Sequence, residues 1–184
     1  MKKSSREIAP LLCLFLLVAW SLSAQTASKV NNKPCLTFAQ DFYNWYVANV
    51  FENFKATNPE MPWREAMKYK GDPFSTELSR ALIESEAEAK AEGDPVLDFD
   101  PILGTQDPAD RYVVRSVSKK NGHCWAQVYG VWSRDASGPG KQPQVIAELA
   151  LTDGRWVFVN FHYPISTSPE SENLLSILRH RYHH

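Results

Sequence analysis

The second half of the chain alternates apolar and polar residues, and this pattern restricts the possible folds more than any other feature. Alternation with a period of two predicts four β-strands, over residues 111–119, 123–132, 144–152 and 155–161. The first two are separated by Asn121-Gly122 and the last two by Asp153-Gly154, dipeptides typical of two-residue hairpin turns. Strands joined by such short turns must pair antiparallel, so this half is predicted to form a twisted antiparallel sheet.

The first half has helical periodicity instead. Residues 37–55 place aromatic residues at steps of three and four, which predicts a helix with one broad apolar face. Thr37 and Gln40 have the spacing of a capping box, in which each side chain satisfies a free backbone N–H group. Residues 57–73 contain three prolines and are predicted to be a loop with one helical turn.

Two more helices are expected. One runs from about residue 73 to 92, with Asp72 as its N-cap and Gly93 as a left-handed stop. A short closing helix is predicted over residues 169–181, capped by Ser168. The sequence therefore predicts the α+β class, with N-terminal helices packed on a curved antiparallel sheet of about four strands and a short C-terminal helix.

The N-terminus has the layout of an export signal. Three basic residues, Lys2, Lys3 and Arg6, precede an apolar run over residues 11–22, and Ala24 is the expected cleavage site. We therefore divide the chain into a signal peptide (1–24), a flexible tail (25–35) and a single α+β domain (36–184). A periplasmic or secreted protein with no stable membrane anchor after cleavage is expected. The net charge of −1 disfavours nucleic acid as a partner, because nucleic-acid binding needs a basic surface.

Two cysteines remain after the predicted cleavage, Cys35 and Cys124. An oxidising compartment permits a disulfide between them, which would join the start of the first helix to a central strand. Two buried thiols are the alternative, since a free cysteine packs as a small hydrophobic residue.

An acidic segment between the helices and the strands has three interpretations. Asp98, Asp100 and Asp107 lie within ten residues, together with Gln106, a proline and a glycine. They could hold a hard cation such as calcium, although the spacing does not match a calcium-binding loop. They could supply acid/base chemistry, because crowded carboxylates have separated pKa values. The structural alternative is that aspartates accept hydrogen bonds from nearby backbone N–H groups and shape a turn.

Several short motifs together resemble a family of bacterial exported proteins catalogued as domain of unknown function 3828. The motifs are Phe42-Tyr43-Asn44-Trp45-Tyr46, Phe74-Ser75 with Leu78, Asp98-Phe99-Asp100-Pro101 with Gln106-Asp107, and Asp153-Gly154-Arg155-Trp156. The resemblance covers roughly residues 36–180 and implies a cone like that of nuclear transport factor 2, in which helices fold over a curved sheet and often leave a pocket. Many members are lipoproteins, but Cys13 lacks the context for lipid attachment. The resemblance brings no catalytic residue, and related exported domains that bind toxins make partner binding an option.

The expected function is an exported, non-catalytic binding or interaction domain for an unknown protein or small-molecule ligand. Its candidate ligand-binding residues are Tyr43, Tyr46, Asp98, Asp100, Gln106, Asp107, Trp125, Tyr129 and Trp156. We expect no catalytic constellation, no metal site and no cofactor, since no nucleophile, zinc or phosphate-loop motif is present. His123 and His162, near strand ends, are candidates for a pocket mouth. The alternatives are a cone-fold enzyme with Asp100 or Asp107 as acid or base, and a structural envelope protein that could form a homodimer through the outer sheet face.

Overall fold

A computed structural model describes residues 33–55, 57, 61–93, 97–133, 138–164 and 173–180. The predicted signal peptide, most of the predicted tail, Ser168 and the two terminal histidines lie outside these residues. None of the described helices is long and apolar enough to cross a membrane.

The predicted sheet is present as a four-stranded antiparallel meander. Its strands β1 (Arg111–Lys120), β2 (His123–Val131), β3 (Val145–Thr152) and β4 (Arg155–His162) lie side by side in chain order. Both two-residue turns have positive φ at both positions, 53° and 81° for Asn121-Gly122 and 50° and 76° for Asp153-Gly154. This backbone twist matches that of the flanking strands, which confirms the hairpins expected from the sequence.

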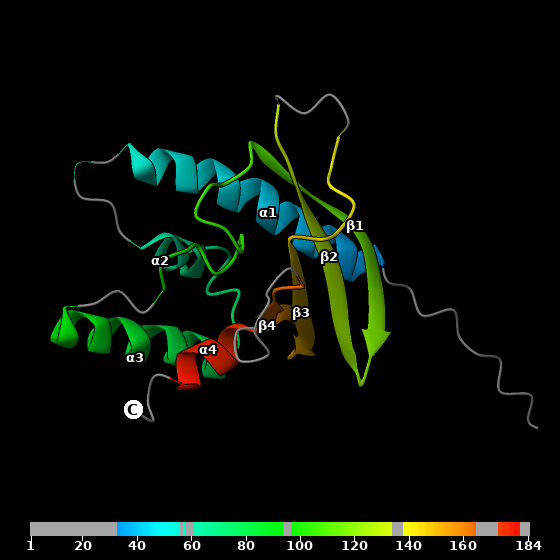
Figure 1. Cartoon of the computed structure of the whole chain (residues 1–184). Helices are drawn as coiled ribbons and strands as arrows, with labels where there is room; N and C mark the ends of the chain where they lie inside the picture. The colour runs from blue at the N-terminus through cyan, green and yellow to red at the C-terminus, as the bar shows by residue number, and fades with distance from the viewer. Residues whose placement is uncertain are drawn as a thin grey trace, which may run out of the picture. The chain divides into compact units, whose positions relative to one another are not determined.

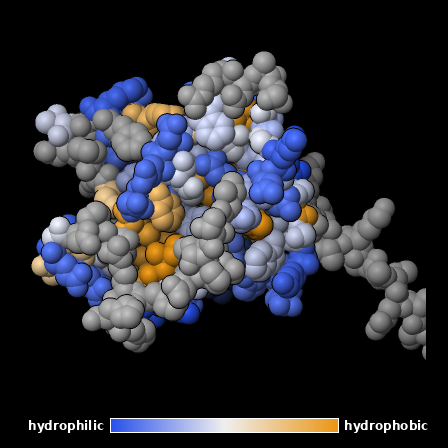
Figure 2. Space-filling view, viewed as in Figure 1, coloured by the Kyte–Doolittle hydropathy of each residue, from blue (hydrophilic) through white to orange (hydrophobic). Residues whose placement is uncertain are grey.

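Four helices accompany the sheet: α1 (Lys33–Phe54), α2 (Pro62–Met67), α3 (Thr76–Glu92) and α4 (Leu174–His180). The α+β class is therefore confirmed. Helix α1 crosses behind β1 and β2 in the view of Figure 1 and contacts both, while α3 and α4 contact each other and β4. In the view of Figure 2, hydrophobic side chains, in orange, gather mainly over the part of the surface that the helices form rather than over the strands.

Three helix starts differ from the prediction. The closing helix α4 begins at Leu174 and not at residue 169, because Asn173 pairs with His162 in a β-bridge and its Oδ1 accepts from the Ser176 N–H at 3.0 Å. Helix α1 begins at Lys33, so residues 33–35 are helical rather than part of a flexible tail, and Thr37 lies inside the helix. Helix α3 is capped by Ser75, whose hydroxyl accepts a hydrogen bond from the Leu78 N–H at 3.2 Å, and not by Asp72. Asp72 instead accepts from the Phe74 N–H and the Ser79 hydroxyl, because it has a positive φ of 62° in the turn before the helix. Gly93 ends α3 in the left-handed conformation, as predicted.

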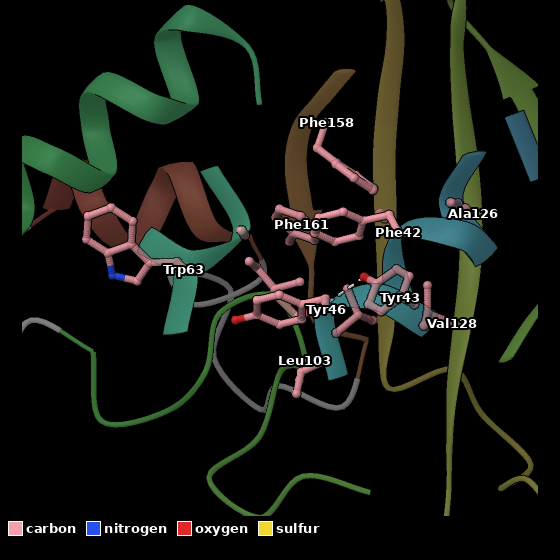
Figure 3. Packing of buried hydrophobic residues seen from close by; sticks show 14 of the residues in the cluster. Phe42, Tyr43, Tyr46, Trp63, Leu103, Ala126, Val128, Phe158 and Phe161 are labelled. Atoms are coloured by element: carbon pink, nitrogen blue, oxygen red, sulfur yellow. Dashed lines mark hydrogen bonds between the residues drawn. The ribbon is translucent and has the colours of Figure 1, made fainter. Parts of the chain in front are cut away.

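Aromatic residues of α1 form the centre of the core. The ring of Phe42 stacks on Tyr46 at a centroid distance of 5.5 Å and lies 4.6 Å from Phe158 of β4. Figure 3 shows Phe42 and Tyr43 beside Phe158 and Phe161, with Trp63 of α2 further out. All five side chains are almost fully buried, so this face of α1 supplies much of the apolar area removed from water.

The side chain of Gln40 binds the free edge of the sheet rather than the start of its own helix. Its amide accepts from the Val114 N–H at 2.8 Å and donates to the Tyr112 carbonyl at 2.9 Å. Strand β1 is an edge strand, and the sheet register shifts between Val114 and Ser116. The capping box expected for Gln40 is thus wrong, because pairing an exposed strand edge gives its amide two backbone partners at once.

Replacing Gln40 with Ala is expected to lower the free energy of unfolding by about 1–3 kcal/mol, since two part-buried backbone groups lose their partners. Urea denaturation measures this loss, and faster hydrogen exchange at the Val114 amide would locate it. Asp41→Ala, on the exposed side of the same helical turn, is the control. Equal stability of the Gln40 variant and the control would contradict the edge-binding role.

Candidate functional site

The acidic segment forms a tight turn organised by one buried carboxylate. Asp100, only 8% exposed, accepts hydrogen bonds on Oδ1 from the Ile102 N–H at 2.8 Å and the Leu103 N–H at 3.0 Å. Its Oδ2 accepts from the Tyr46 hydroxyl at 2.8 Å. Burial raises the pKa of Asp100 to about 6, and the three hydrogen bonds oppose that rise because they favour the ionised form.

Three tyrosine hydroxyls hold this turn against the core. Tyr43 donates to the Ile102 carbonyl at 3.1 Å, Tyr46 to Asp100, and Tyr163 to the Pro101 carbonyl at 2.8 Å. Burial raises the pKa of each phenol well above its ordinary value. Tyr43 and Tyr46, both predicted to bind ligand, therefore have their hydroxyls directed at the protein's own backbone and carboxylate.

The other polar residues of the segment lie at the surface. Asp98 and Gln106 are exposed and bond to each other, with 3.1 Å between the Gln106 Nε2 and the Asp98 Oδ2. Asp107 is exposed, and its backbone N–H and carbonyl both bond to the Thr105 hydroxyl. Within the described residues, no three His, Cys, Asp or Glu side chains are grouped as a metal ion would require. Of the three aspartates, Asp100 has the turn-shaping role, since its carboxylate accepts from two backbone N–H groups of the turn.

The aromatic candidates on the strands are divided between the two faces of the sheet. Trp125 and Tyr129 lie on the face away from the helices, since they alternate with the buried Cys124, Ala126 and Val128. Trp156 pairs with Leu151 and packs against the core, which places it on the helix side. The nine predicted ligand-binding residues are therefore not brought together at one site.

The two strand histidines share one carboxylate on the helix-free face. His123 Nδ1 lies 2.6 Å from Glu148 Oε1, and His162 Nε2 lies 2.8 Å from Glu148 Oε2. Trp125 packs on the His162 ring at a centroid distance of 4.6 Å. Both imidazoles have a carboxylate on the neighbouring strand as partner, and neither lines the sheet-end cavity described next.

A cavity of about 630 Å³ lies at one end of the sheet, and we call it the sheet-end cavity. It is an open hollow between the acidic turn, the connection between β2 and β3, the residue after β4, and α4. Its lining includes Phe99, Gly104, Thr105, Gly130, Trp132, Lys141, Gln142, Gln144, Tyr163 and Ile177. A volume of this size and a mainly apolar lining surface that includes three aromatic rings are typical of small-molecule sites in proteins.

At two glycines of the cavity wall, side chains from other residues pack directly against the backbone. A Cβ atom on Gly130 would lie 2.5 Å from the Gln144 Oε1, and one on Gly104 would lie 2.7 Å from the Val145 Cγ2. Gly104 also has a positive φ of 67°, which disfavours any other residue there. The cavity wall thus depends on the turn that Asp100 holds, because Phe99 and Gly104 flank that turn directly.

None of the nine predicted residues lines the sheet-end cavity. Three of them, Asp98, Asp100 and Gln106, line a second hollow of about 500 Å³ that shares Phe99 and Thr105 with it. One sequence signal for the larger cavity was available: Gly130 lies within a predicted strand, where glycine often marks close approach of a backbone or a ligand. Trp132, Gln144 and Tyr163 lie at strand ends and carried no such signal.

Comparison with protein-family models, curated proteins and solved structures found no match to this chain. Cys35 and Cys124 form a disulfide, with their Cα atoms 6.7 Å apart, so the alternative of two free thiols does not apply. This bond is consistent with an oxidising, extracytoplasmic location. The function must therefore be argued from the geometry of the domain.

Proposed function

We propose that this chain is a non-catalytic binding domain, periplasmic or secreted, that takes a small organic ligand in the sheet-end cavity. The observation that carries the proposal is the cavity itself, about 630 Å³ in volume and lined by Phe99, Trp132 and Tyr163. The edge of the Phe99 ring meets the Tyr163 ring at a centroid distance of 5.3 Å and an interplanar angle of 88°. Such a pair presents a rigid aromatic wall, which binds a ligand at a low cost in side-chain entropy.

The acid/base alternative has less support from the geometry. Asp100 is the buried carboxylate nearest to this wall, and both of its oxygens accept hydrogen bonds from the protein. A group that holds a turn together is poorly placed to exchange a proton with a ligand, because moving it would leave buried N–H groups unpaired. The binding function is therefore favoured over an enzyme that uses this aspartate.

Membership of the family catalogued as domain of unknown function 3828 is part of the same proposal. Its support is the set of motifs quoted from the sequence, and a pocket at the end of a sheet that helices cover agrees with what that resemblance implies. A protein ligand would need a different surface, since the sheet-end cavity has the size of a small molecule.

A screen of uncharged aromatic fragments by two-dimensional NMR tests the proposal. Fragments are expected to shift the signals of Trp132 and Tyr163, and Ile177→Trp, which places a larger ring in the cavity, is expected to abolish those shifts. Ile83→Trp is the matched control, because Ile83 is 46% exposed and lies outside the cavity. Failure of every fragment to bind, or equal binding by the Ile177 variant, would contradict the proposal.

A further inference from the structure

The sheet-end cavity combines aromatic side chains with two carboxamides, that of Gln144, which is half-buried, and that of Gln142, which is exposed. Phe99, Trp132 and Tyr163 supply the rings, and Gln144 lies among them. The Gln144 side chain makes no hydrogen bond to any other residue that the structure describes. A carboxamide offers one acceptor oxygen next to two donor hydrogens, so it can bind a ligand through two parallel hydrogen bonds.

The backbone of Gln144 is held in a fixed place. Its N–H donates to the Val128 carbonyl at 2.9 Å, which continues the pairing of β2 with the segment leading into β3. Its side-chain oxygen lies over Gly130, where a Cβ atom would approach to 2.5 Å. The carboxamide oxygen thus lies against the Gly130 backbone, on the same side as the Trp132 ring, which an added Cβ on Gly130 would meet at 3.3 Å.

The charge of the lining restricts the ligand further. Among the described lining residues, Lys141 is the charged one, and it is exposed. A charged group moved deep into the cavity would lose its hydration without gaining an opposite charge there. A neutral ring does not carry this cost and gains contact with the aromatic walls.

We infer that the sheet-end cavity recognises an uncharged planar ring with an adjacent N–H and C=O, as in a lactam, through the Gln144 carboxamide between the aromatic side chains. The inference rests on the proposed binding function and deepens it by naming the ligand class. Gln144 would pair with the edge of the ring, its oxygen accepting from the ring N–H and its nitrogen donating to the ring C=O. In protein–DNA complexes, a glutamine side chain recognises adenine through a similar pair of hydrogen bonds.

Calorimetric titration of the protein with quinolin-2(1H)-one and with 1-methylquinolin-2-one tests this inference. The two probes have the same ring and carbonyl group, but the methyl group removes the N–H donor. We expect the lactam to bind about tenfold more tightly than its N-methyl analogue. In Gln144→Leu, which keeps the size of the side chain, the two probes are expected to bind equally.

Gln144→Glu is a second variant, because it keeps the shape and the acceptor for the ring N–H while losing the donor to the ring C=O, which both probes have; it should weaken both probes and keep the preference for the lactam. A midpoint of thermal unfolding equal to that of the wild-type protein would show that each variant keeps its fold. If both probes bind the wild-type cavity equally well, the Gln144 inference is overturned while the proposed binding function stands. Tighter binding of quinoline-2-carboxylate that is lost in Lys141→Met would also overturn it, in favour of an anionic ligand. If no probe or fragment binds, the proposed function itself fails.

Discussion

Loss of the Cys35–Cys124 disulfide is expected to lower the free energy of unfolding by about 4–5 kcal/mol. The bond joins residues that are 89 positions apart. Opening a loop of that length returns a large conformational entropy to the unfolded chain, and the chain-entropy model gives this magnitude. Since domains of this kind have a total stability of about 5–15 kcal/mol, the reduced protein should be marginally stable.

The position of the disulfide explains why other contacts do not replace it. Cys35 lies in the first turn of α1 and Cys124 near the start of β2, and both are fully buried. Further along α1, the Gln40 side chain makes a second connection from this helix to the sheet, through its two hydrogen bonds to β1. Without the covalent bond, the beginning of α1 is held by packing alone, and we expect it to separate first.

Equilibrium urea denaturation with and without dithiothreitol measures the effect. Protein produced without residues 1–24 contains only these two cysteines, so the reductant acts on this disulfide alone. The double variant Cys35→Ala/Cys124→Ala is the control and should be insensitive to the reductant. An unchanged urea midpoint for the oxidised and reduced proteins would show that the disulfide does not contribute to stability.

Replacing Asp100 with Ala is expected to lower the free energy of unfolding by about 3–5 kcal/mol. The change leaves the Ile102 and Leu103 N–H groups and the Tyr46 hydroxyl without their acceptor in a buried turn, at about 1–3 kcal/mol for each group. Asp100→Asn should cost less, because its side-chain oxygen still accepts from the two backbone groups. The alanine variant should also lose fragment binding, since the turn forms a wall of the sheet-end cavity.

Asp100 also predicts an unusual dependence of stability on pH. Burial raises its pKa from 3.8 to about 6 in the folded protein, so folding favours the protonated carboxyl. The stability that this group contributes is full below pH 4 and is lost as the pH rises through 6. Compared with Asp100→Asn, the wild-type protein should therefore lose about 2 kcal/mol of stability between pH 4 and pH 7.

Urea denaturation of the wild type and of Asp100→Asn across this pH range tests the sign. The difference between the two proteins isolates Asp100 from all other titrating groups. Asp98→Asn, two residues away and exposed, should run parallel to the wild type. A difference that grows in the opposite direction, with the wild type gaining stability as the pH rises, would mean that the three hydrogen bonds outweigh the burial.

The strands and most helix positions follow from interactions between sequence neighbours. Asn121-Gly122 and Asp153-Gly154 adopt positive φ because their own chemistry permits it, and period-two alternation then determines which residues face the core. Side chains with a choice of partners were predicted less well. Gln40 was predicted to cap its own helix, but its side chain binds β1 instead. Asp72 was predicted to cap α3, but Ser75 caps that helix.

The sequence by itself determined the α+β class, the order and pairing of the strands, and the two cysteines able to form a bridge. Only the tertiary structure determines that the two cysteines are bonded and that the buried Asp100 carboxylate holds a turn through its hydrogen bonds. It also determines that the sheet-end cavity lies among Phe99, Trp132, Gln144 and Tyr163. The physical reason is distance along the chain. Turn and strand preferences act over a few residues, whereas the Tyr43 contact with the Ile102 carbonyl spans 59 positions and exists only once the helix has packed on the sheet.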